Sequence, residues 1–262
     1  MTDSSDSVDR QSPLHQLHVD AGASFTDFAG WQMPVRYSSD LAEHHAVRTA
    51  AGIFDISHMA EITVAGPGAS AFLDFALAGK LSAVGIGQAK YSLLLAPTGG
   101  IIDDLVAYRR SDDEFLVVAN AGNRFPVVAA LTERAAGFDV TVVDRSDEIS
   151  LIAVQGPRSR GILEATTGLN HFGTPLDELK YYRSTDARFG DIPVIVGRTG
   201  YTGEDGFELY VAADAAADLW RALTAAGAGF GLVPAGLASR DTLRLEAGMP
   251  LYGHELNLDT LP

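Results

Sequence analysis

The sequence contains no cysteine, so disulfides, thiolate catalysis, iron–sulfur ligation and cysteine-type zinc sites are excluded. Basic side chains are also scarce, because 19 Lys and Arg stand against 34 Asp and Glu, which gives a formal net charge of -15. A surface of that charge repels nucleic acid and anionic membranes, and we expect neither as a partner. No apolar run approaches the roughly 20 residues that a membrane-spanning helix requires.

Residues 1–13 are polar and acidic and lack the basic start and apolar run of a signal peptide. We expect this segment to be a disordered tail of a cytoplasmic protein. The lack of cysteine agrees with a reducing compartment. With 47% hydrophobic residues in 262, the chain can bury a large core, in one large domain or two modest ones.

The order of the expected elements occurs twice along the chain, each time as strand, Gly-Pro turn, helix, hairpin, strand and helix. The first set is 61–65, 66–67, 69–77, 91–108, 115–119 and 124–135. The second set is 150–154, 156–157, 158–166, 182–198, 207–211 and 214–226. The identity between the halves is low, so this is an architectural echo. It predicts an α+β fold of two ferredoxin-like units, with antiparallel sheets covered by helices on one face and a ligand cleft between the units.

Helix signals flank these two units. Ser39 is a typical N-cap residue, and we expect a helix from there to about Ala51 that Gly52 ends. Towards the end of the chain, a short helix is expected from Arg240 to Glu246.

Two adjacent carboxylates lie inside the expected strand at 101–108. Because side chains alternate along a strand, Asp103 and Asp104 point to opposite faces, and both faces carry apolar neighbours. At least one carboxylate is therefore expected where water is scarce, a costly position unless the group is paired or functional. The alternative is that both lie near a hairpin end and cap backbone amides.

The run from Gly197 to Leu209 has glycine at every third position four times. Glycine permits sharp turns and close approach of a ligand to the backbone. Because Glu204 and Asp205 would repel a phosphate, we expect the loop to suit a ligand with hydrogen-bond donors, such as an amine or the amino-pyrimidine edge of a pterin. An ordinary tight β-connection is the alternative.

Two further polar residues lie where the sequence changes from one element to the next. Asn120 ends a strand, and Arg240 lies at a helix start, where its guanidinium can bind a carboxylate or a carbonyl. The alternatives are a helix cap for Asn120 and a cap with a surface ion pair for Arg240. The histidines lack metal-ligand spacing, and isolated His58 is typical of a structural residue, so no metal site is predicted.

Six segments that occur together and in order resemble a known family. They are Phe28–Pro34, Phe54–Met59, Gly99–Leu105, Gln155–Pro157, Arg198–Glu208 and Ala238–Glu246. From about Leu14 to Pro262, the chain resembles the T-protein family of the glycine cleavage system, the aminomethyltransferases. Each motif alone is moderately specific, whereas six in order are strongly so.

The resemblance implies a folate-binding cloverleaf of three domains with tetrahydrofolate in a central channel. We expect a discontinuous first folate-binding α+β domain, residues 14–60 plus 145–262, and a second ferredoxin-like domain, residues 61–144. The family moves the one-carbon unit from the aminomethyl-lipoyl arm of its partner, H-protein, to tetrahydrofolate. The products are 5,10-methylenetetrahydrofolate, ammonia and the dihydrolipoyl carrier.

The resemblance also implies roles for single residues. Asp104 matches the catalytic aspartate, which lies near the folate nitrogens that receive the carbon. A fixed carboxylate there stabilises the cationic carbon left after loss of ammonia. The folate-binding positions are Tyr91, Asn120, Tyr181, Tyr201, Glu208 and Arg240.

The chain departs from the family pattern in two places. The family's chains continue into a β-rich third domain, and since Leu256–Pro262 forms no closing element, we expect a chain that lacks most of that domain. Ala60 stands where the family has glycine.

The alternatives to an aminomethyltransferase are a folate-dependent demethylase, a non-catalytic folate-binding relative and an inactive fragment. No flavin-binding segment accompanies the chain, and 248–255 lacks the cysteine of the non-catalytic group's motif.

Overall fold

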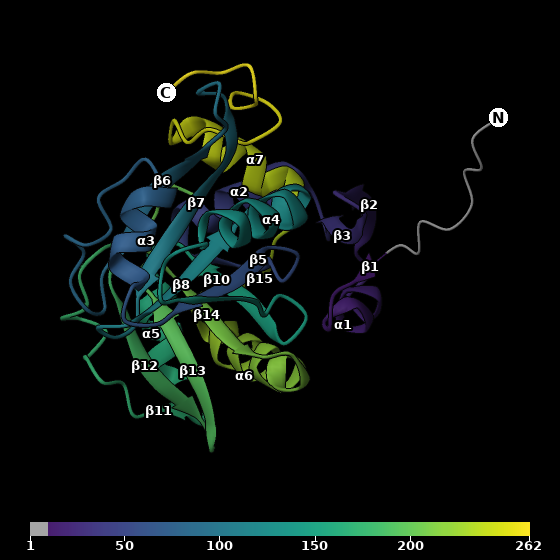
Figure 1. Ribbon diagram of the computed structural model, residues 1–262. Helices are drawn as coiled ribbons and strands as arrows, with labels where there is room; N and C mark the ends of the chain where they lie inside the picture. Colours follow the sequence, from purple (N-terminus) through teal and green to yellow (C-terminus); the bar gives the residue numbers. More distant parts are fainter. Residues whose placement is uncertain (1–9) are drawn as a thin grey trace.

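The structure, a computed structural model, describes residues 10–262, which form two large β-sheets and one small one (Figure 1). The largest sheet has seven strands in the order β11-β12-β13-β14-β10-β4-β15. They are β4 (Ala51–Asp55), β10 (Ile149–Gln155), β11 (Leu169–Asn170), β12 (Ser184–Phe189), β13 (Ile192–Gly197), β14 (Gly206–Ala212) and β15 (Leu232–Pro234). Neighbouring strands are antiparallel except β15 and β4, which pair in parallel at one edge.

The second large sheet has five strands in the order β6-β7-β8-β5-β9, and every pair is antiparallel. They are β5 (Ala60–Ala65), β6 (Ala89–Leu95), β7 (Ile101–Arg109), β8 (Glu114–Ala119) and β9 (Thr141–Asp144). All five strands come from residues 60–144, whereas the seven-stranded sheet takes strands from both sides of that segment. The division of the chain into domains stays a prediction.

Each large sheet buries one face against helices. Phe207 of the seven-stranded sheet shares one buried cluster with Leu219 of α6, and Leu105 of the five-stranded sheet shares another with Phe72 of α3. Burying a side chain of this size stabilises the fold by about 1.5–3 kcal/mol. The α-helices are α1 (His15–Asp20), α2 (Asp40–Thr49), α3 (Ala69–Ala76), α4 (Arg124–Arg134), α5 (Ser159–Ala165), α6 (Ala216–Gly227) and α7 (Leu237–Glu246). In residues 10–262 no helix is long and apolar enough to cross a bilayer.

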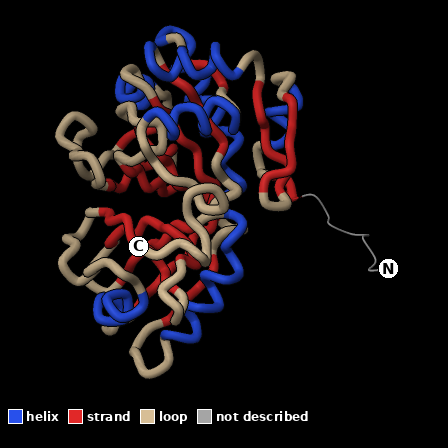
Figure 2. The backbone as a smooth tube through the Cα atoms, turned by 90° about the horizontal axis from the view of Figure 1, so that it is seen from above, coloured by secondary structure: helices blue, strands red, loops and turns tan. Residues whose placement is uncertain are grey.

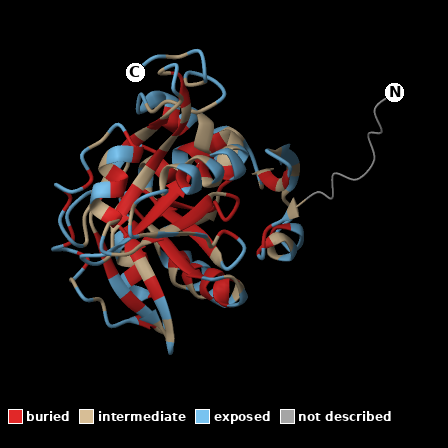
Figure 3. Ribbon diagram, viewed as in Figure 1, coloured by how far each residue is buried: buried red, intermediate tan, exposed pale blue. Residues whose placement is uncertain are grey.

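The remaining faces of the two large sheets pack against each other. Side chains alternate along a strand, so Ile152 of β10 faces the helices while its neighbour Leu151 faces the other sheet. Tyr108 of β7 and Tyr210 of β14 belong to the same inner cluster, although their strands lie in different sheets. The central strands are buried along most of their length (Figure 3). Polar side chains on these inner faces are therefore brought together away from bulk water.

The small sheet, with β3 between β1 and β2, lies beside the large ones (Figures 1 and 2). Its strands are β1 (Arg10–Gln11), β2 (Ser24–Phe28) and β3 (Trp31–Arg36). The expectation of a disordered tail is wrong for residues 10–13. Arg10 lies over the ring of Trp31, and the buried hydroxyl of Ser12 donates to Asp55, so both residues are fixed to the folded protein. Residues 1–9 of the expected tail lie outside the described residues.

The predicted α+β class is confirmed, and three details differ from the expectations. Two of the three sheets are mixed, because β1 pairs with β3 in the small sheet and β15 with β4 in the seven-stranded sheet in parallel, whereas the five-stranded sheet is antiparallel as expected. Gly52 does not end α2 but lies within β4, where a Cβ would stand 2.6 Å from Cγ2 of Val47. The helix expected at 214–226 begins at Ala216, after a 3₁₀ turn, η2 (Ala213–Ala215), that contains Asp214. The other 3₁₀ turns are η1 (Ala121–Asn123) and η3 (Ala228–Phe230).

Candidate active site

A cavity of about 300 Å³ lies between the inner faces of the two large sheets. Its walls include Val106 and Val118 from the five-stranded sheet and Leu151 and Tyr210 from the seven-stranded sheet. Six of the seven predicted site residues line it: Tyr91, Asp104, Asn120, Tyr201, Glu208 and Arg240. These six come from segments far apart in the sequence, and the meeting of the two sheets brings them together.

Asp104 lies on β7 with a hydrogen-bond donor on each carboxylate oxygen. The side-chain amide of Asn120 donates to Oδ1 over 2.8 Å, and the hydroxyl of Tyr91 donates to Oδ2 over 3.2 Å. Burial raises the pKa of Asp104, and these two donors oppose the rise. The carboxylate is thus held in one orientation at the wall of a mostly apolar cavity.

Asp103 points to the other face of β7 and is fully buried. It accepts hydrogen bonds from the Asn120 backbone N–H at 2.9 Å and from the Asn123 side chain at 2.6 Å. Burial raises the pKa of Asp103 to about 7. Asn120 therefore does not cap the following helix with its side chain, as one alternative held, but links the two neighbouring aspartates.

Glu208 reaches the cavity from β14, on the face opposite the helix-packed core. The hydroxyl of Thr199 donates to its Oε2, and the hydroxyl of Tyr108 lies 3.3 Å from the same oxygen. Burial raises the pKa of Glu208, and the nearby charge of Arg240 opposes the rise. Its other oxygen, Oε1, has no hydrogen-bond donor among residues 10–262, so this oxygen can accept a hydrogen bond from a ligand.

Arg240 lies in the first turns of α7 with its guanidinium carbon 4.4 Å from the ring centroid of Tyr201. Its side chain makes no hydrogen bond or ion pair with any residue of the described chain. The alternative of a surface ion pair is therefore wrong. Burial lowers the pKa of Arg240, because the charge is poorly solvated there. A planar guanidinium with unused donors can bind a carbonyl or a carboxylate through two hydrogen bonds.

The acids at the tip of the glycine-rich segment do not face the cavity. Glu204 pairs with Arg48 at 3.0 Å, and Asp205 pairs with Arg198 at 2.8 Å. The expectation that these two carboxylates accept donors from a ligand is therefore not met, and of the three acids in the run only Glu208 lines the cavity.

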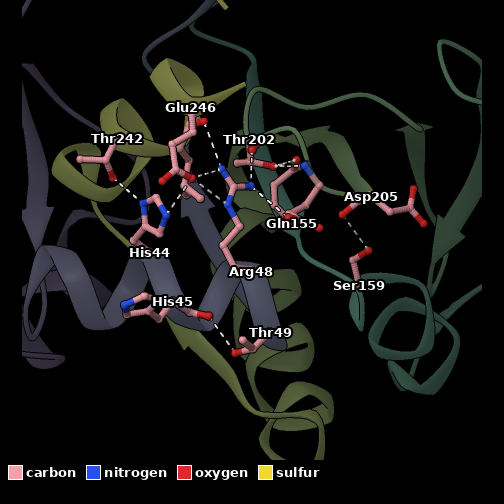
Figure 4. A network of polar contacts seen from close by, with 12 residues as sticks. His44, His45, Arg48, Thr49, Gln155, Ser159, Thr202, Asp205, Thr242 and Glu246 are labelled. Carbon is pink, nitrogen blue, oxygen red and sulfur yellow. Dashed lines mark hydrogen bonds and ion pairs between the residues drawn. The ribbon is translucent and has the colours of Figure 1, made fainter. Parts of the chain in front are cut away.

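The glycines of this segment serve close packing. A Cβ on Gly200 would stand 1.9 Å from Oε1 of Gln155, and one on Gly206 would stand 2.4 Å from its Nε2. Gln155 accepts a hydrogen bond from the hydroxyl of Thr202 at 2.9 Å. In Figure 4, Arg48 of α2 reaches the carbonyl of Thr202 and the carboxylate of Glu246 in α7. The loop is thus fixed to β10, α2 and α7, which places Glu208 and Tyr201 beside Arg240.

Tyr181, the seventh predicted residue, is 52% exposed and does not line the cavity, whereas its neighbour Tyr182 does. Tyr182 has a left-handed φ of 58°. Its backbone is fixed on both sides, because its N–H donates to Arg198 and its carbonyl accepts from Ala89. Two adjacent tyrosines in a loop carry no alternation pattern, so the sequence offers no signal for choosing between them. The binding role of Tyr181 stays a prediction.

Sequence reasoning missed further wall residues. Thr199 and Tyr210 line the cavity, as do Met249, Pro250 and Leu251 after α7. The alternation of Glu208 and Tyr210 on β14 could have indicated Tyr210, because both share one face. In residues 10–262 no three His, Asp or Glu side chains gather as metal ligands, and the expectation of no metal stays a prediction.

The fold and the cavity define a class: an α+β protein with two facing sheets that form a largely apolar cavity containing two carboxylates and one guanidinium. The family model described as GCVT N-terminal domain matches residues 14–262. The chain belongs to this family, that of the glycine cleavage T-proteins, and the resemblance read from the sequence is confirmed. Its relatives are named aminomethyltransferases, so it is a member of an enzyme family of tetrahydrofolate-dependent transferases.

Two curated relatives show how much of the chain is shared. An aminomethyltransferase from Cutibacterium acnes is 60% identical over 258 residues, which cover 97% of this chain and 69% of the relative. An aminomethyltransferase from Streptomyces avermitilis is 55% identical over 98% of this chain and 68% of the relative. The chain thus spans a little over two thirds of the length of these relatives.

Solved structures agree with the fold. The glycine cleavage system aminomethyltransferase T from Bartonella henselae superposes with a TM-score of 0.88 at 40% identity, over 97% of this chain and 67% of that one. A chain of the heterotetrameric sarcosine oxidase from Corynebacterium sp. U-96 has a TM-score of 0.57 at 17% identity, which shows the shared fold alone.

Proposed function

We propose that this chain transfers the one-carbon unit from the aminomethyl-lipoyl arm of H-protein to tetrahydrofolate, giving 5,10-methylenetetrahydrofolate and ammonia. The observation that carries the proposal is the convergence of Asp104, Glu208 and Arg240 on one cavity between the sheets of a family member. H-protein is the proposed partner, and the cytoplasm is the proposed location.

The side chains around the cavity fit a reduced pterin. The rings of Tyr91, Tyr182 and Tyr201 offer flat surfaces for a heterocycle. Glu208 offers a free carboxylate oxygen to ring and amino N–H groups, and Arg240 offers donors to a carbonyl. At about 300 Å³ the cavity lies at the lower end of the range for small-molecule sites, so it suits the heterocycle rather than the whole folate.

Asp104 is the proposed catalytic residue. When bound, tetrahydrofolate supplies the nitrogens that accept the carbon. Positive charge develops on the transferred carbon as ammonia leaves, and an ionised carboxylate fixed in an apolar cavity stabilises that charge more strongly than water does. Asn120 and Tyr91 hold the carboxylate, so no reorganisation is needed during the reaction. Holding the two reactants in line contributes at most about 7–11 kcal/mol.

Two measurements on the chain test the proposal. Calorimetric titration with tetrahydrofolate is expected to show saturable binding with one site per chain. An assay with aminomethylated, lipoyl-bearing H-protein is then expected to release ammonia and form 5,10-methylenetetrahydrofolate. Binding without transfer would favour a non-catalytic folate-binding protein, and absence of binding would contradict the proposal outright.

A further inference from the structure

Three hydroxyl groups form a continuous row behind Glu208. The hydroxyl of Tyr210 lies 3.2 Å from that of Tyr108, which lies 2.7 Å from Oγ1 of Thr199. Thr199 in turn donates to Oε2 of Glu208. Tyr108, Thr199 and Tyr210 are all buried, so water does not compete for these hydrogen bonds.

Proton counting gives the row a direction. Each hydroxyl has one proton to donate, and an ionised carboxylate only accepts. With Glu208 ionised, Tyr210 donates to Tyr108, Tyr108 donates to Thr199 and Thr199 donates to Oε2. Hydrogen bonds arranged in this way polarise one another, so the last bond to the carboxylate is strengthened by the earlier ones.

The row crosses from one sheet to the other. Tyr108 lies on β7, four residues after Asp104 and on the same face, whereas Tyr210 and Glu208 lie on β14. The Tyr108 hydroxyl is therefore a direct polar link between the strand of the proposed catalytic aspartate and the strand of the proposed folate-binding glutamate.

A glycine makes room for this link. A Cβ on Gly197 would stand 3.0 Å from the Tyr108 hydroxyl and 3.0 Å from Oγ1 of Thr199. Both distances are shorter than ordinary contacts of a methyl group. Gly197 thus leaves the space in which the two hydroxyls meet, an observation independent of the hydrogen bonds themselves.

From this arrangement we infer that Tyr108, Thr199 and Tyr210 are positioning residues for ligand binding. Their hydroxyls occupy Oε2 of Glu208, keep the carboxylate ionised and direct Oε1 alone to the donors of the bound ligand. The inference rests on the proposed function. It adds the hydrogen-bonded row that sets how strongly Glu208 binds the ligand.

Variants of Thr199 and Tyr108 test the inference through tetrahydrofolate binding. T199V keeps the shape of the side chain and removes the last donor, while Y108F removes the middle one. In each, calorimetry at pH 7 is expected to give affinity weaker by on the order of tenfold, because a hydrogen bond to a charged group is lost. T199S, which keeps the hydroxyl, is expected to restore most of the affinity lost in T199V.

The pH dependence separates positioning from a merely structural role. Donated hydrogen bonds favour the ionised carboxylate, so their removal raises the pKa of Glu208 further. The midpoint at which binding weakens on acidification is therefore expected to move to higher pH in T199V and Y108F. Loss of packing alone would lower affinity at every pH and leave that midpoint in place.

Y37F is the matched control. Tyr37 also has a hydrogen-bonded, partly buried hydroxyl, 2.9 Å from Nδ1 of His18, but it does not line the cavity. Y37F is expected to bind tetrahydrofolate as the unchanged chain does.

Should Y108F fail to fold in a thermal unfolding assay, the comparison of T199V with T199S decides. Equal affinity and an equal midpoint in T199V and T199S would overturn the inference, whereas absence of binding in the unchanged chain would contradict the proposed function instead.

Discussion

The side-chain amide of Asn120 lies 2.8 Å from Oδ1 of Asp104, at the point where β8 ends beside β7. The same amide group reaches Asp103, so one residue fixes two carboxylates that point to opposite faces of a strand. Neither aspartate has an arginine or lysine partner among residues 10–262. The cavity therefore holds its proposed catalytic carboxylate with neutral donors, which leave the negative charge of Asp104 unpaired and available to a substrate.

Arg240 is expected to bind ligand through its planar shape as well as its charge. R240K keeps the charge but loses the paired donors and the stacking on Tyr201. Calorimetry should show tetrahydrofolate affinity lower by about tenfold in R240K. R221K, at an exposed arginine that pairs with Asp218, is the control and should bind normally. Normal binding by R240K would remove Arg240 from the ligand site.

Glu61 makes folding stability dependent on pH. Its carboxylate is fully buried, and neither oxygen has a hydrogen-bond partner in the described chain. Burial raises the pKa of Glu61 well above its usual value, with Asp144 adding to the rise and Arg124 opposing it. A raised folded-state pKa means that the contribution of Glu61 to stability is present at low pH and is lost as pH rises above the unfolded-state value of about 4.3.

E61Q is therefore expected to be more stable than the unchanged chain at pH 7 and about equally stable at pH 4. The reason is that the amide has a similar shape but does not ionise, so the folded state loses no stability at this position as pH rises. Urea unfolding at both pH values measures the difference. E133Q, at an exposed glutamate of α4, should show no such pH-dependent gain. A constant difference between E61Q and the unchanged chain from pH 4 to pH 7 would contradict this explanation.

Gly206 is expected to tolerate no side chain. A Cβ there would stand 2.4 Å from Nε2 of Gln155, whose amide is fixed by the carbonyl of Thr199. G206A should lower the free energy of unfolding by about 1–3 kcal/mol, as overpacking does in buried sites. G229A is the control, because nothing lies within 4 Å of the Cβ position at Gly229. Equal unfolding midpoints for G206A and G229A would show that the loop can move away from Gln155.

Local patterns predicted the central strands of both large sheets, because alternation and turn residues act within a few residues of each other. The same alternation led to the expectation that at least one of the two aspartates is poorly solvated, and Asp103 is fully buried while Asp104 is partly buried. The partners of Glu204 and Asp205 could not be predicted, since Arg48 and Arg198 reach them through the fold. Residues 10–13 were wrongly assigned to a disordered tail for the same reason.

The assignment of single site residues depended more on the family resemblance than on pattern. The sequence alone left a capping role open for Asn120 and a surface ion pair open for Arg240, and the structure excludes both. Between Tyr181 and Tyr182, only the structure shows which one reaches the cavity, because Tyr182 lines it and Tyr181 is 52% exposed outside it.

The most direct test of the proposed mechanism compares D104N with the unchanged chain in two assays. The amide has the shape of the carboxylate but not its charge, so tetrahydrofolate binding measured by calorimetry should change little. Transfer from aminomethylated H-protein should fall by at least about tenfold, because the charge that stabilises the developing cation is gone. Near-normal transfer by D104N, with folate bound, would contradict the catalytic role of Asp104.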